Sequence, residues 1–134
     1  MPITVSIVED NEQLRGTLCR LINREEGFSC VSQYGDAESA LESLPKEKPE
    51  VVLMDINLPK MNGVECVRKL KQVAPEILTV MLTAYEDTEN IFAALSAGAS
   101  GYLLKRAPRA ELLEAIREVK QGGSPMTTHI ARKV

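Results

Sequence analysis

The sequence has few cysteines and no arrangement of them that is typical of a disulfide framework or a zinc site. Cys19, Cys30 and Cys66 are odd in number, and no two of them have Cys-x-x-Cys spacing. We interpret them as reduced thiols. The single histidine, His129, lies in a polar stretch and is interpreted as a solvated side chain. A disulfide-rich scaffold and a zinc centre built on cysteines are therefore excluded.

The pattern of a leader peptide and long apolar runs are not found in the sequence either. The start of the chain, Met1-Pro2-Ile3-Thr4, has no basic region followed by an apolar core, so no signal peptide is predicted. No apolar run approaches the ~18 residues needed to cross a membrane. We therefore expect a cytoplasmic protein without a membrane partner.

Positive charge is not in excess. The chain has 16 Lys and Arg against 19 Asp and Glu, a formal net charge of −3. A generally basic nucleic-acid binder is excluded, because neutralisation of phosphates supplies most non-specific affinity for nucleic acids. Internal repeats and low-complexity segments are absent as well. The 134 residues, 44% hydrophobic and 26% charged, are instead typical of one globular domain.

The apolar residues alternate five times between a strand pattern and a helix pattern. We predict strands over residues 3–8, 28–34, 51–54, 77–82 and 102–104, and helices over residues 11–24, 36–45, 64–74, around 91–95, and 108–121. Asp36 is the expected N-cap of the second helix, and Pro45 is its expected end. Short loops between alternating elements predict an α/β fold with helices on both faces of a parallel sheet. We expect the flavodoxin-like, doubly wound (βα)5 arrangement, with five parallel strands in the order 2-1-3-4-5.

Polar side chains follow four of the predicted strands at the points where those strands end. Glu9 and Asp10 follow the first strand, Asp55 the third, Thr83 the fourth and Lys105 the fifth. Binding sites of open α/β sheets form outside the carboxyl ends of the strands. These five side chains are therefore expected to converge on one edge of the sheet.

Asp10 and Asp55 would lie side by side in the expected strand order. Two like charges about 5 Å apart repel by roughly 3 kcal/mol at an effective dielectric constant of about 20. A cation or a raised pKa must relieve this repulsion, and oxygen ligands suit Mg²⁺. The set favours a carboxylate nucleophile that receives a phosphoryl group. In the alternative interpretation, Glu9 or Asp10 only caps the following helix, and Lys105 is a solvated lysine.

Together these motifs resemble a known family. The chain is similar to the receiver domain of two-component response regulators over residues 3–121, most of all in the NarL/FixJ branch with its LuxR-type helix-turn-helix output domain. The motifs that carry the resemblance are Glu9-Asp10-Asn11, Leu53-Met54-Asp55-Ile56-Asn57-Leu58-Pro59, Met61-Asn62-Gly63, Leu82-Thr83-Ala84 and Tyr102-Leu103-Leu104-Lys105.

The resemblance implies a phosphoacceptor and a metal site. Asp55 would be the phosphorylated residue. Mg²⁺, or Mn²⁺ in its place, would be ligated by the side chains of Asp10 and Asp55 and by the backbone carbonyl of Asn57. Glu9 would bind the metal through a water molecule.

The resemblance also implies a conformational switch. Thr83 and Tyr102 would be the switch pair, in which the hydroxyl moves toward the phosphoryl group and the aromatic ring turns inward. Lys105 would contact the phosphoryl group. Two residues separate Lys105 from Pro108, a loop similar to that of the NarL/FixJ branch.

The resemblance further implies a signalling function. A sensor histidine kinase would phosphorylate the domain. The domain would assist its own phosphorylation and dephosphorylation without being an enzyme. A homodimer is expected on phosphorylation. We expect residues 1–121 to form the receiver domain and residues 122–134 to form a linker toward a helix-turn-helix domain that is absent from this chain. DNA would be bound only through that absent domain. The alternative is a stand-alone receiver that acts only through protein contacts.

Two other classes of protein fit the site less well. A flavodoxin-like cofactor binder needs a loop after the first strand that accepts phosphate, but the acidic residues 9–12 would repel phosphate. A phosphohydrolase with an aspartyl-phosphate intermediate needs a second acid two residues after the nucleophile. That position is Asn57, which cannot transfer protons in this way.

Overall fold

The structure is a computed structural model that describes residues 2–84 and 88–124. Strands and helices alternate along this part of the chain. His129 and residues 125–134 of the expected linker lie outside the described residues. The elements are β1 (Ile3–Val8), α1 (Glu12–Arg24), β2 (Phe28–Tyr34), α2 (Ala37–Glu47), β3 (Val51–Asp55), α3 (Gly63–Val73), β4 (Leu78–Thr83), α4 (Thr88–Ala97), β5 (Gly101–Leu104) and α5 (Arg109–Lys120).

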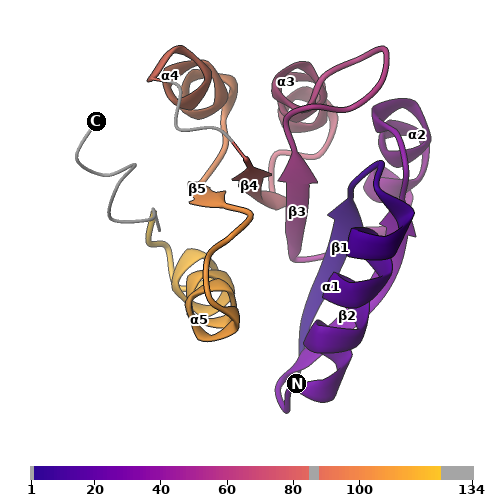
Figure 1. The fold of residues 1–134 in the computed structure, drawn as a ribbon. Helices are drawn as coiled ribbons and strands as arrows, with labels where there is room; N and C mark the ends of the chain where they lie inside the picture. Colours follow the sequence, from indigo (N-terminus) through magenta and orange to yellow (C-terminus); the bar gives the residue numbers. More distant parts are fainter. Residues whose placement is uncertain (1, 85–87, 125–134) are drawn as a thin grey trace.

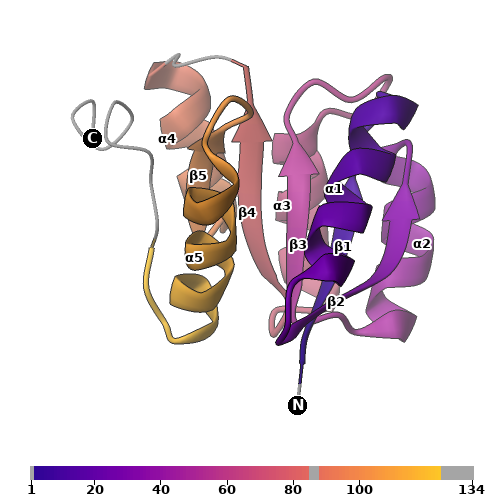
Figure 2. The same cartoon turned by 60° about the horizontal axis from the view of Figure 1, so that its bottom comes forward.

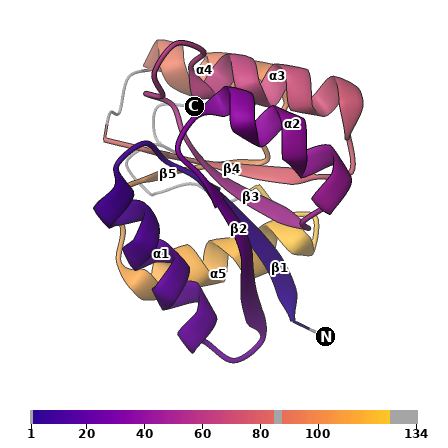
Figure 3. The same cartoon turned by 90° about the vertical axis from the view of Figure 1, so that its right-hand side faces the viewer.

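The strands form one parallel sheet in the order β2-β1-β3-β4-β5, which confirms the predicted fold (Figure 1). Figure 3 shows α1 and α5 on one face of the sheet and α2, α3 and α4 on the other. Every residue of β3 is buried, because this strand lies at the centre of the sheet and both of its faces are covered. No helix among the described residues has the length and apolar character needed to pass through a bilayer.

The core is divided by the sheet into two clusters, as the alternation of side chains along a strand requires. Val52 and Met54 of β3 belong to the cluster under α2, α3 and α4. Val51 and Leu53 belong to the cluster under α1 and α5. The two packed faces hold the carboxyl ends of the strands in a fixed relation to one another.

The cap of α1 is Asn11, and Asp10 does not have the capping role considered for it. The Asn11 side chain accepts a hydrogen bond from the backbone N–H of Leu14 at 3.0 Å. Asp36 caps α2 as predicted, accepting from Ser39 N–H at 2.7 Å. Since Asn11 fills the cap position, the carboxylate of Asp10 is available for another role.

The end of α2 is two residues later than predicted. Pro45 lies inside the helix, which continues to Glu47 and ends at Lys48 in a left-handed conformation with φ of 53°. Proline removes one helical hydrogen bond. The final turn still closes, because Lys48 N–H donates to the carbonyl oxygen of Leu44 at 2.8 Å.

The cysteines are free thiols, as the sequence predicts. Burial raises the pKa of the Cys66 thiol to about 12. Burial and the neighbouring Cys19 thiol raise the pKa of Cys30 to about 12. The reactive form of a cysteine is the thiolate, so neither residue is suited to nucleophilic or redox chemistry at neutral pH.

We expect Cys30 and Cys66 to resist alkylation in the native protein. At neutral pH a thiol of pKa 12 is about 10⁻⁵ thiolate, so iodoacetamide should modify both residues far more slowly than in urea-unfolded protein. Peptide mass spectrometry after timed labelling measures both rates. Equal rates for Cys66 in the native and unfolded protein would contradict this prediction.

Candidate functional site

The five polar residues predicted at the strand ends meet at one edge of the sheet. Asp55 and Thr83 are the last residues of β3 and β4, whereas Glu9 and Asp10 follow β1 and Lys105 follows β5. The strands are parallel, so their carboxyl ends lie on the same side (Figure 2). Because β1, β3, β4 and β5 are consecutive neighbours, the side chains are brought together by the strand order itself.

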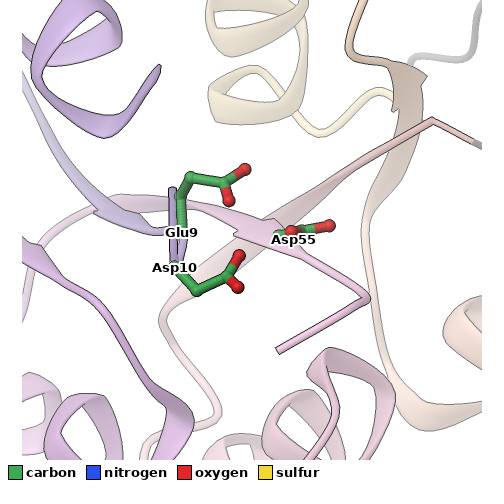
Figure 4. Close-up of side chains that lie close together, drawn as sticks. All are labelled: Glu9, Asp10 and Asp55. Carbon is green, nitrogen blue, oxygen red and sulfur yellow. The ribbon is translucent and has the colours of Figure 1, made fainter. Parts of the chain in front are cut away.

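Three carboxylates form an acidic cluster at this edge. One carboxylate oxygen from each of Glu9, Asp10 and Asp55 lies within 4.8 Å of the other two (Figure 4). Glu9 and Asp55 are buried, with 2% and 3% of their surface exposed, whereas Asp10 faces solvent. The pKa of Asp10 is raised by its hydrogen bond with Glu9, by partial burial and by the charge of Glu9. An acidic cluster that is open to solvent on one side can hold a metal ion.

Lys105 is the cation that partly neutralises this cluster. Its Nζ lies 2.7 Å from Oε1 of Glu9 and 3.0 Å from Oδ2 of Asp55. Burial lowers the pKa of the ammonium group, but the hydrogen bonds and charges of Glu9 and Asp55 outweigh burial, so the pKa is raised. Counted by formal charge, the three carboxylates and the one ammonium leave two negative charges in excess. This excess corresponds to the charge of one divalent cation.

The backbone around Glu9 is held by neighbouring elements. Its N–H donates to the carbonyl oxygen of Tyr34 at 3.0 Å, and its carbonyl oxygen accepts from Nη1 of Arg15 at 2.7 Å. Its carboxylate oxygen Oε2 accepts from Asn11 N–H at 3.0 Å. Sequence reasoning did not identify Arg15, because a single basic residue on an amphipathic helix gives no signal that distinguishes it from a solvated one.

The loop between β3 and α3 approaches Asp55 very closely. Asn57 is exposed, and its backbone N–H donates to Oδ1 of Asp55 at 3.2 Å. Gly63 N–H donates to the carbonyl oxygen of Ile56 at 2.8 Å. A Cβ at position 63 would lie 2.1 Å from the backbone oxygen of Asp55. Only glycine fits there, and the close approach fixes the position of Asp55 relative to α3.

Thr83 and Tyr102 are both fully buried, with no exposed surface. The backbone oxygen of Thr83 accepts from Lys105 N–H at 2.7 Å, so the ends of β4 and β5 are tied together. The side chain of Tyr102 belongs to the core cluster under α2, α3 and α4. The structure thus gathers Glu9, Asp10, Asp55 and Lys105 into one group and places Thr83 next to it, with the Tyr102 ring directed into the core.

A comparison with models of protein families identifies the family to which this chain belongs. The model of the response regulator receiver domain matches residues 5–117, which is most of the chain. The chain belongs to the response regulator receiver family. A receiver domain is a signalling module of two-component systems, in agreement with the resemblance found in the sequence.

Curated relatives of this receiver domain are response regulators. The chain is 39% identical to the transcriptional regulatory protein DegU of Brevibacillus brevis over 130 residues, covering 95% of this chain and 55% of DegU. It is 35% identical to the response regulator GacA of Pseudomonas viridiflava over 132 residues, covering 98% of this chain and 62% of GacA. The receiver domain thus spans less than two thirds of the length of these relatives.

Solved structures agree with the sequence comparison. A two-component response regulator of the LuxR family from Aurantimonas sp. SI85-9A1 matches with a TM-score of 0.94 and 30% identity, over 99% of this chain and 95% of that one. The response regulator domain of Thermotoga maritima CheB matches with a TM-score of 0.84 and 26% identity, over 90% of this chain and 98% of that one. The likeness to the LuxR-type branch predicted from the sequence is confirmed.

Proposed function

We propose that this receiver domain is a phosphoacceptor, in which a sensor histidine kinase or a small phosphodonor transfers a phosphoryl group to Asp55. The observation that carries the proposal is the environment of the Asp55 carboxylate. It is 3% exposed, lies within 4.8 Å of two other carboxylates and is 3.0 Å from an ammonium group. Phosphoryl transfer depends mainly on positioning and on the stabilisation of charge, and these neighbours can supply both.

The residues present fit a magnesium ion. The donors are all oxygen atoms, which Mg²⁺ prefers, and the exposed Asp10 leaves one side open to water and to a phosphodonor. The side chains of Asp10 and Asp55 and the backbone carbonyl of Asn57 would hold Mg²⁺ or Mn²⁺, and Glu9 would act through a water molecule. The bound ion would neutralise charge on the phosphoryl oxygens.

The protein's own groups have separate parts in the transfer. A carboxylate oxygen of Asp55 forms the new bond to phosphorus while the bond from phosphorus to the donor breaks, and the leaving group keeps the electron pair. The Lys105 ammonium, already 3.0 Å from Asp55, then pairs with a phosphoryl oxygen, and the Thr83 hydroxyl donates to another. Movement of Thr83 together with Tyr102 would carry the change to the output surface.

The output is proposed from the relatives. DegU is named a transcriptional regulatory protein, and the chain covers 55% of its length. We therefore expect residues 1–121 to act as the receiver and residues 122–134 as a linker to a helix-turn-helix domain, with DNA binding and phosphorylation-dependent dimerisation as properties of the longer protein. A stand-alone receiver in the cytoplasm that acts through protein contacts is the alternative.

The direct test is intact-protein mass spectrometry after incubation with acetyl phosphate or phosphoramidate. In the presence of Mg²⁺ we expect a mass gain of one phosphoryl group, and we expect none when EDTA removes the metal. The requirement for metal follows from the two excess negative charges that would otherwise repel the donor. No gain with either donor, or an equal gain in EDTA, would refute the proposal.

A further inference from the structure

The contacts of Arg15 connect the acidic cluster to the rest of the fold. Arg15 is a half-buried residue of α1, and its Nη1 donates a 2.7 Å hydrogen bond to the backbone carbonyl of Glu9. This bond is charge-assisted and short. Glu9 lies just beyond the end of β1, where the strand ladder no longer fixes the direction of its carbonyl group.

The guanidinium group also lies close to the backbone of Gly35. An ideal Cβ at Gly35 would lie 3.1 Å from Nη1 of Arg15 and 3.8 Å from its Cζ. Gly35, in the loop between β2 and α2, therefore leaves the room that the guanidinium occupies. Tyr34, the residue before it, accepts the N–H of Glu9 at 3.0 Å. Arg15 thus lies between the loop that follows β1 and the loop that follows β2.

We propose that Arg15 is a positioning residue for cation binding, because it fixes the peptide group from which the Glu9 and Asp10 side chains diverge. The inference rests on the proposed function, since it concerns the same metal site. The carbonyl group of Glu9 and the N–H group of Asp10 form one planar peptide group. Rotation of that peptide would move the exposed Asp10 carboxylate away from Asp55, whereas the guanidinium prevents this rotation.

A purely structural role predicts something different. If Arg15 only anchored α1, its loss would lower the stability of the protein in the absence of metal and leave the metal affinity unchanged. If Arg15 positions the metal ligands, its replacement lowers the affinity for the metal ion even in a variant that remains fully folded without metal. Residues that orient metal ligands through hydrogen bonds typically affect metal affinity by about 10-fold to 100-fold.

The test is isothermal titration calorimetry of the full chain with Mg²⁺, repeated with Mn²⁺. We expect Arg15→Met to weaken binding about tenfold or more, and Arg15→Lys to restore part of the affinity because an ammonium can still donate one hydrogen bond. Gly35→Ala should give a smaller loss, because its Cβ forces the guanidinium to shift. The thermal midpoint of each variant without metal is measured alongside.

Arg20→Met is the matched control. Arg20 is an exposed residue of the same helix and donates to Thr17 Oγ1 at 3.3 Å, so this change removes the same charge without touching Glu9. We expect wild-type affinity for this variant. An equal loss of affinity in Arg20→Met would show that net charge, not position, matters, and would overturn the inference.

The remaining outcomes separate the inference from the proposed function. If wild-type protein binds neither Mg²⁺ nor Mn²⁺, the proposed metal-dependent function fails. If wild-type protein binds and Arg15→Met binds equally well, only the role of Arg15 is refuted. A lower thermal midpoint with unchanged affinity would likewise assign Arg15 a structural role alone.

Discussion

Replacing Asp55 by asparagine should abolish the phosphoryl mass gain of the protein in acetyl phosphate and Mg²⁺. Asparagine has nearly the same shape, but its amide is not a nucleophile for phosphorus. The fold should be retained, because the amide oxygen can still accept from Asn57 N–H and Lys105 keeps its 2.7 Å ion pair with Glu9. Intact mass spectrometry measures the loss, and circular dichroism checks the fold.

Asp36→Asn is the matched control for this substitution. Asp36 caps α2 with its side chain, and asparagine caps a helix about as well as aspartate. The mass gain should therefore persist in this variant, and in Asp10→Ser when Mg²⁺ is raised. A normal mass gain in Asp55→Asn would show that another residue is the phosphoacceptor.

Replacing Gly63 by alanine should destabilise the protein by about 3 kcal/mol. The new Cβ would lie 2.1 Å from the backbone oxygen of Asp55 and 2.9 Å from Cα of Ile56. Both neighbours are backbone atoms at the end of the central strand β3, so no side chain can rotate away to make room. Urea denaturation measures the loss of stability. Phosphorylation should also slow, because relief of the clash displaces Asp55.

Gly16→Ala provides the comparison for Gly63→Ala. Gly16 lies in α1, and a Cβ there would meet only the flexible end of Arg20 at 3.3 Å. Alanine is a better helix former than glycine, so this variant should be as stable as wild type or more stable. If both alanine variants unfolded at the same urea concentration, the close approach at Gly63 would not constrain the loop.

The apolar pattern and the polar residues that follow the strands are sufficient to predict the strand order. They also predict that the three carboxylates and Lys105 lie together at one edge of the sheet. Apolar runs that end in Asp55 and Thr83 fix where two strands stop, and the strand order then brings their ends beside Glu9 and Lys105. The predicted proximity of the three carboxylates and Lys105 is confirmed. The chemical roles of these residues stay predictions, because proximity does not establish reactivity.

Other features depend on contacts that no local pattern encodes. Asp10 and Asn11 are both good capping residues at consecutive positions, and only the path of the chain decides that Asn11 caps α1. Arg15 differs from a solvated arginine by its contact with a backbone oxygen of Glu9. Gly63 is identifiable as part of a family motif, but the sequence does not show that a Cβ there would clash with the backbone of Asp55 and Ile56.

The two ion pairs of Lys105 have a consequence for the outermost strand of the sheet. β5 is joined to the sheet only through β4, yet the side chain that follows it reaches across to residues at the ends of β3 and β1. Lys105 therefore adds ion pairs with residues at the ends of β3 and β1 to the backbone pairing that joins β5 to β4. If Asp55 is phosphorylated as proposed, the charge that Lys105 contacts would change, so the end of β5 would be exposed directly to a chemical event at the end of the central strand β3.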